Sequence, residues 1–101
     1  MRITIFGATG LLGKALMHEW NGDEVTGLGS RDADIRSQQD IRRAITQHRP
    51  DCIVLAAAYT DVDGCETNRE LAFAVNCEGA ARVAQAAAES GSHISALIGN
   101  A

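Results

Sequence analysis

The chain has 101 residues, of which 46% are hydrophobic and 22% are charged, and this composition is that of an ordinary globular protein. Its length predicts a single domain, residues 1–101, with a hydrophobic core of its own. The net charge of -4 gives no electrostatic reason to expect nucleic acid or an anionic membrane as a partner, and no apolar run approaches the ~20 residues that span a bilayer.

The cysteines favour a reducing environment. Cys52, Cys65 and Cys77 are odd in number and show no Cys-x-x-Cys spacing, which argues against a disulfide framework and against a zinc site. An apolar run begins almost directly after Met1, which leaves no room for a signal peptide. We therefore expect a cytoplasmic protein whose cysteines serve in packing.

Strand and helix patterns alternate along the whole chain. Apolar and β-branched runs predict strands at residues 2–6, 24–28, 33–35, 52–57 and 93–98, of which the third is very short. Helical spacing predicts helices at residues 11–20, between Ser37 and Pro50, and over 61–90, the last with or without an interruption near 67–69. Such alternation is typical of right-handed crossovers and a parallel sheet with helices on both faces.

The spacing within each helix indicates its buried face. The first helix is expected to bury Leu12, Ala15, Leu16 and Trp20 and to expose Lys14 and His18. The second has a capping serine, Ser37, with Asp40 three residues later, and presents Ile41, Ala44, Ile45 and His48 on one face. The third presents Ala72, Val75, Asn76, Gly79, Ala80, Val83 and Ala87, and Gly91 ends it. The Asn76 amide on that face either ties the helix to a strand or orders a site.

These elements predict a Rossmann-like, doubly wound α/β fold with a parallel sheet of about five strands. The expected strand order is 3-2-1-4-5, numbered along the chain. In that order a crevice opens beside the first strand, at the carboxyl ends of the strands.

The turn after the first strand carries the most specific motif of the chain. Gly7, Gly10 and Gly13 follow the strand and open a helix. Glycine allows a tight turn, close approach of a pyrophosphate, and close helix–strand packing, and the helix N-terminus favours an anion. The segment from Gly7 to Gly13, including Thr9, Leu11 and Leu12, is therefore predicted to hold the pyrophosphate of a dinucleotide. The alternative is a strand-to-helix turn with no ligand.

The loop after the second strand favours NADP over NAD. No carboxylate occupies the strand end, where an enzyme that prefers NAD places one for the ribose 2′-hydroxyl. Gly29 gives space instead, Ser30 offers a hydroxyl, and Arg31 can pair with a 2′-phosphate through two hydrogen bonds. The alternative is a solvated Arg31 whose charge Asp32 partly neutralises.

Two further segments complete the predicted site. Asp34 and Ile35 are placed to frame the adenine edge. Ala56, Ala57, Ala58 and Tyr59 end the apolar strand at its carboxyl tip, where small side chains let a cofactor lie across the backbone. Tight packing against a helix would explain the same alanines.

The sequence resembles the dTDP-4-dehydrorhamnose reductases, a family of extended short-chain dehydrogenases/reductases. The resemblance covers about residues 1–95, most specifically Ala57–Asp63 and Ala74–Asn76, and it corresponds to the N-terminal portion of the family only. It implies NAD(P)H-dependent reduction of a 4-keto sugar nucleotide, with a cofactor site lined by Gly7, Gly10, Leu11, Leu12, Arg31, Asp34, Ile35, Ala56, Ala57 and Tyr59. Leu55 stands where the family has asparagine, and Ala96 follows His93-Ile94-Ser95 where the family continues Thr-Asp-Tyr.

The proton-donating pair of the family, Tyr-x-x-x-Lys, is absent. Tyr59 is followed four residues later by Asp63, and Lys14 lies in the first helix. No catalytic residue is therefore assigned, and three interpretations remain. The chain is a cofactor-binding module without chemistry of its own, a minimal oxidoreductase completed by oligomerisation, or an interaction module that has lost the nucleotide. The open edge of the last strand predicts a homodimer through residues 93–99.

Overall fold

The computed structural model describes residues 1–56 and 78–97. Several sequence-based expectations fall outside these ranges and are not addressed by it: Ala57, Ala58, Tyr59, Asp63, Cys65, Asn76, Cys77 and most of the helix expected over 61–90. No helix within the described ranges is both long enough and apolar enough to cross a bilayer.

The described strands form one parallel sheet with the order β2-β1-β3-β4. The strands are β1 (Arg2–Phe6), β2 (Glu24–Leu28), β3 (Cys52–Leu55) and β4 (His93–Leu97). β1 pairs with both β2 and β3, and its last residue, Phe6, lies beside Leu28 of β2 and Leu55 of β3. A shift between β3 and β4 pairs Ile53 with Ile94 and Val54 with Ala96. The Rossmann-like parallel sheet and the relative order of these four strands are confirmed.

The short third strand expected at residues 33–35 is absent, and this expectation was wrong. The N–H groups of Asp32 and Ala33 both donate to the carbonyl of Gly29, 3.0 Å away, in a turn. The Asp34 N–H donates to the carboxylate of Asp40 at 3.2 Å. These donors are committed locally, so the segment does not join the sheet beside β2, although Ala33 and Ile35 are buried.

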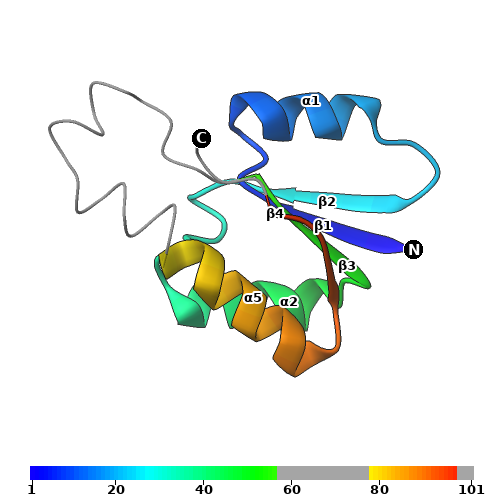
Figure 1. Cartoon of the computed structure of the whole chain (residues 1–101). Coiled ribbons are helices and arrows are strands. Elements are labelled where there is room, and N and C mark those ends of the chain that lie inside the picture. Colours follow the sequence, from blue (N-terminus) through cyan, green and yellow to red (C-terminus); the bar gives the residue numbers. More distant parts are fainter. Residues whose placement is uncertain (57–77, 98–101) are drawn as a thin grey trace, which may run out of the picture.

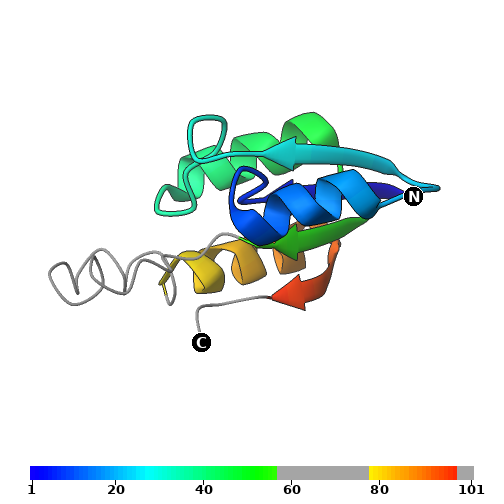
Figure 2. The ribbon, with the colours of Figure 1, turned by 90° about the horizontal axis from the view of Figure 1, so that it is seen from above.

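The helices cover both faces of the sheet, as expected. Helix α1 (Leu11–Glu19) lies on one face, while α2 (Gln38–His48) and α5 (Gly79–Ser90) lie side by side on the other (Figures 1 and 2). Each face has its own core. Ile3, Ile5, Cys52 and Val54 form the core under α1, and the larger core under α2 and α5 centres on Phe6, Ile41, Ile53, Leu55 and Val83.

The buried face of α1 differs from the predicted one. Leu12 and Ala15 are exposed, whereas Gly13 is buried and Leu16 and Trp20 are half-buried. Leu16 and Trp20 pack against the core as expected, but the position closest to the strand-to-helix turn is taken by Gly13, which has no side chain. Helical spacing alone assigns large apolar residues to the inside and does not reveal a glycine at the closest contact.

The start and end of α2 follow the sequence prediction. The Ser37 hydroxyl accepts a hydrogen bond from the Asp40 N–H at 3.2 Å, which is the expected cap. Arg49 ends the helix in the left-handed conformation, with Pro50 after it. The face made by Ile41, Ala44 and Ile45 is buried. In α5, the predicted Gly79, Val83 and Ala87 are buried and Gly91 ends the helix with φ 79°.

Candidate dinucleotide site

The strand-to-helix turn is fixed to the carboxyl end of β2. Gly7 has φ 83°, a conformation that favours glycine. The N–H groups of Gly7 and Ala8 both donate to the carbonyl oxygen of Leu28, at 2.8 and 3.0 Å. The chain therefore turns sharply after β1. The turn lies at the carboxyl ends of the strands, where parallel-sheet proteins bind ligands.

Gly13 allows α1 to approach that turn. A Cβ atom on Gly13 would overlap the Gly7 carbonyl oxygen and would lie 2.6 Å from the Cα of Ala8. These are backbone atoms that cannot move aside without moving the turn. The third glycine is therefore required by packing.

Gly10 differs from the other two glycines in that neither its backbone conformation nor its described neighbours require a glycine. Its φ and ψ of -75° and 175° are open to any residue, and a Cβ atom would make only an ordinary contact, 3.5 Å from the Gly7 oxygen. The described residues therefore leave room for a side chain at Gly10. Neither backbone conformation nor packing within residues 1–56 and 78–97 requires a glycine there.

The N-terminus of α1 next to Gly10 offers donors to an anion. The N-cap residue of this helix, Gly10, provides no side-chain cap, and the first turn has no acidic residue. The first N–H groups of a helix have no partner within the helix, and the helix dipole adds positive potential there. Leu11, which is 93% exposed, and Leu12 flank this surface as predicted cofactor residues.

A turn at the end of β2 presents Ser30 and Arg31. Gly29 and Asp32 close it with two hydrogen bonds: the Asp32 N–H donates to the Gly29 carbonyl at 3.0 Å, and the Gly29 N–H donates to the Asp32 carboxylate at 2.9 Å. Ser30 and Arg31 occupy the two central positions and are exposed. Within the part of the chain that the structure describes, Arg31 makes no hydrogen bond or ion pair, and it does not pair with Asp32.

The two loops of the site touch through Thr9 and Gly29. A Cβ atom on Gly29 would lie 2.8 Å from the Cγ2 of Thr9 and 3.3 Å from its Oγ1. The space that the sequence analysis assigned to Gly29 is thus occupied by Thr9. This contact holds the Ser30–Arg31 turn beside the glycine turn.

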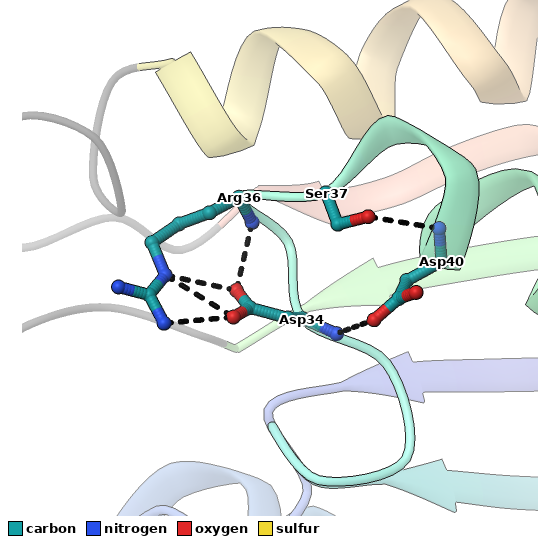
Figure 3. A network of polar contacts seen from close by, with 4 residues as sticks. All are labelled: Asp34, Arg36, Ser37 and Asp40. Carbon is teal, nitrogen blue, oxygen red and sulfur yellow. Dashed lines mark hydrogen bonds and ion pairs between the residues drawn. The ribbon is translucent and has the colours of Figure 1, made fainter.

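Asp34 takes part in a polar network at the start of α2 (Figure 3). Its carboxylate accepts hydrogen bonds from the Arg36 guanidinium at 2.8, 3.1 and 3.2 Å and from the Arg36 N–H at 2.9 Å. The side-chain hydrogen bonds from Arg36 lower the pKa of Asp34 and outweigh the opposing effect of burial. Asp34 is therefore a fixed carboxylate at the loop between β2 and α2.

The remaining predicted site residues differ in how accessible they are to a ligand. The Ile35 side chain is 5% exposed and belongs to the core under α2, so only its backbone is available to a ligand. Ala56 is half-buried just beyond β3, and its N–H donates to the Phe6 carbonyl at 2.9 Å. The backbone there is close to the glycine turn, whereas Ala57, Ala58 and Tyr59 lie outside the described residues.

One contributor to the site was missed by the sequence analysis, and a second, Asp32, was given a different role there. A Cβ atom on Gly27 would lie 2.7 Å from the Sδ of Met17 and 2.8 Å from the Cβ of Ala8, so this strand glycine lets α1 and the turn pack on β2. A glycine inside a strand is a known sign of such an approach. Asp32, whose carboxylate closes the turn at the end of β2, had no distinguishing pattern in the sequence beyond its place after Arg31.

The RmlD substrate binding domain family matches residues 1–97. The chain is 41% identical over 87 residues to a dTDP-4-dehydrorhamnose reductase of Streptomyces griseus, covering 84% of this chain and 29% of the relative. It is 37% identical over 95 residues to the reductase of the same name from Mycobacterium tuberculosis, covering 92% and 31%. The chain thus spans about three-tenths of the length of these relatives.

Solved structures show the same correspondence. The crystal structure of dTDP-4-dehydrorhamnose reductase from Bacillus anthracis in complex with NADP aligns with TM-score 0.87 and 35% identity, covering 92% of this chain and 34% of that one. The orthologue from Clostridium acetobutylicum aligns with TM-score 0.85 and 31% identity, covering 93% and 34%.

Proposed function

The chain belongs to the RmlD substrate binding domain family, and from this membership we propose that it is the N-terminal, cofactor-binding portion of an NADP(H)-dependent keto-sugar-nucleotide reductase. The relatives that support this substrate class are named dTDP-4-dehydrorhamnose reductases. The B. anthracis relative was crystallised with NADP.

The vacant space at Gly10 is the observation that carries the proposal. Among the described residues, a Cβ atom there would meet no atom closer than 3.5 Å, and it would lie at the N-terminus of α1. Packing explains Gly13 and backbone conformation explains Gly7. A pyrophosphate against Gly10 supplies the missing reason for the second glycine of the motif.

The turn at the end of β2 supports NADP rather than NAD. Arg31 is a cation with no partner among the described residues, and Ser30 beside it carries a hydroxyl. A 2′-phosphate would accept hydrogen bonds from both. No carboxylate ends β2, where the 2′-hydroxyl of NAD would require one.

The role of this portion is to bind and orient the cofactor. When bound, NADP(H) supplies the hydride-transfer chemistry. The glycine turn holds the pyrophosphate, the Ser30–Arg31 turn holds the 2′-phosphate, and Asp34 and the Ile35 backbone face the adenine. Reduction of a ketone also needs a proton donor at the carbonyl oxygen. We assign none to this chain, so the chemical step depends on groups outside the portion described above.

A titration with NADPH and NADH tests the proposal. We expect NADPH to bind, and Gly10→Asp to abolish binding because it puts a side chain and a negative charge in the pyrophosphate position. Gln39→Asp adds the same charge at an exposed position on α2 and is expected to leave binding unchanged. If neither cofactor binds at millimolar concentration, the proposal is wrong and an interaction module takes its place.

The same variants distinguish a minimal oxidoreductase. If the chain alone oxidises NADPH in the presence of a keto-sugar nucleotide, and Gly10→Asp abolishes this, the active site is completed between copies of the chain. The proposal includes a homodimer through the edge of β4 and a cytoplasmic setting. The latter agrees with an odd number of cysteines that lack metal-ligand spacing.

A further inference from the structure

We propose that Asp32 is a positioning residue that determines the preference for a 2′-phosphorylated cofactor. It does so by closing the turn that presents Ser30 and Arg31. This inference rests on the proposed function, because it assigns a determinant of cofactor choice within the same site.

Gly29 and Asp32, which close the turn, each donate a hydrogen bond to the other. Asp32 donates its N–H to Gly29 and accepts the Gly29 N–H on its carboxylate, at 3.0 and 2.9 Å. The Ala33 N–H also donates to the Gly29 carbonyl, at 3.0 Å. Ser30 and Arg31 are therefore held at the tip of a closed turn, although neither side chain makes a hydrogen bond or ion pair within the part of the chain that the structure describes.

The same hydrogen bond controls the electrostatics of the turn. Asp32 follows Arg31 directly, and a free carboxylate there would pair with the guanidinium or repel a phosphate. Its binding to the Gly29 N–H directs the carboxylate to the backbone instead. Arg31 consequently remains without a partner among the described residues and is available to an anion.

The position of the turn relative to the pyrophosphate site also depends on Gly29. Gly29 packs against Thr9 of the glycine turn, and the Leu28 carbonyl just before it accepts the N–H groups of Gly7 and Ala8. The carboxylate of Asp32 thus holds Gly29, and Gly29 in turn packs against Thr9 of the glycine turn. Releasing it would let Arg31 move away from the pyrophosphate, with little change in the glycine turn itself.

Two substitutions separate the hydrogen bond from the charge. Asp32→Asn removes the charge but keeps an oxygen that can accept the Gly29 N–H, whereas Asp32→Ala removes both. The comparison between these two neutral variants isolates the turn-closing hydrogen bond. Asp51→Ala is the matched control, because Asp51 also accepts a backbone N–H, that of Arg2 at 2.7 Å, at the opposite, amino-terminal end of the strands.

The dissociation constants of NADPH and NADH are measured for all variants. We expect Asp32→Ala to bind NADPH about tenfold more weakly than Asp32→Asn, with NADH changed less than about twofold between them. Asp51→Ala should match the wild type for both cofactors. Equal NADPH affinity of the two Asp32 variants would overturn the inference, and so would an equal loss for NADPH and NADH.

The outcome for the wild-type chain separates this inference from the proposed function. A wild type that binds neither cofactor removes the proposed function, and the inference with it. A wild type that binds both cofactors, with Asp32 variants that do not discriminate between them, overturns the role of Asp32 alone.

Discussion

Gly13 faces the carbonyl oxygen of Gly7 so closely that the two positions share one packing constraint. A Cβ atom on Gly13 would overlap that oxygen, while a Cβ atom on Gly10 would lie 3.5 Å from it. The glycines of the turn therefore have separable roles: backbone conformation at Gly7, helix packing at Gly13 and, under the proposed function, ligand approach at Gly10. Substitutions at Gly10 and Gly13 should have different consequences.

Gly13→Ala is expected to destabilise the fold, and Gly10→Ala to impair binding. Overpacking against backbone atoms should cost Gly13→Ala about 3 kcal/mol of unfolding free energy. Gly10→Ala should cost less than about 1 kcal/mol, because alanine is only a weaker N-cap. Urea unfolding measures both, and NADPH titration of the folded Gly10→Ala chain should show weakened binding. A Gly10→Ala variant with wild-type NADPH affinity would remove the reason given for the second glycine.

Arg31→Ala should reduce cofactor discrimination. Hydrogen bonds to a charged phosphate contribute about 1.5–3 kcal/mol, so NADPH affinity is expected to fall about 10- to 100-fold, with NADH affinity nearly unchanged. Arg31→Lys should lie between, since an ammonium keeps the charge but loses the two-pronged geometry. Arg42→Ala, on the exposed face of α2, serves as the control. Equal affinity for both cofactors in the wild type would contradict the assignment.

Ser37→Ala should destabilise the chain by about 1 kcal/mol, because the Asp40 N–H at the start of α2 loses its acceptor. Ser37→Asn keeps an acceptor and should remain close to the wild type. The midpoints of urea unfolding at neutral pH measure both differences. An alanine variant as stable as the asparagine variant would show that the cap does not contribute.

Asp34 predicts a pH dependence of stability. Its pKa is lowered in the folded chain by hydrogen bonds from Arg36, so its contribution is present above the pKa of the unfolded state. That contribution is lost as the pH falls through the lower, folded-state pKa. Because the pair is partly exposed, Arg36→Gln should cost only about 0.5 kcal/mol at pH 6.

The difference between the wild type and Arg36→Gln should shrink as the pH falls through the lowered folded-state pKa of Asp34, where the carboxylate becomes protonated in both states. Unfolding by urea at a series of pH values measures it. A difference that stays constant down to pH 2 would assign the effect of Arg36 to packing instead of charge.

The edge of β4 predicts association of the chain. We expect light scattering at high concentration to give twice the 10.7 kDa of one chain. The shifted register, which pairs Ile53 with Ile94 and Val54 with Ala96, interrupts the regular ladder near this edge and should keep the dimer weak. A mass of one chain at every concentration would refute the dimer.

Local patterns in the sequence determined the order and kind of the elements. Alternating apolar runs placed β1, β2, β3 and β4, Ser37 and Asp40 marked the start of α2, and Gly91 marked the end of α5. The glycine spacing located the turn of the candidate site. These features depend on residues a few positions apart, and for that reason they can be recognised from one sequence.

Contacts that form only in the folded chain decided the rest. The sequence did not show that Gly13 rather than Leu12 faces inward, because that depends on how closely α1 meets the turn. The strand expected at residues 33–35 is absent because the N–H groups of Ala33 and Asp34 found other acceptors, the Gly29 carbonyl and the Asp40 carboxylate. The different reasons for Gly10 and Gly13, and the tie from Asp32 to Gly29, likewise became visible only once the folded chain had set which atoms lie side by side.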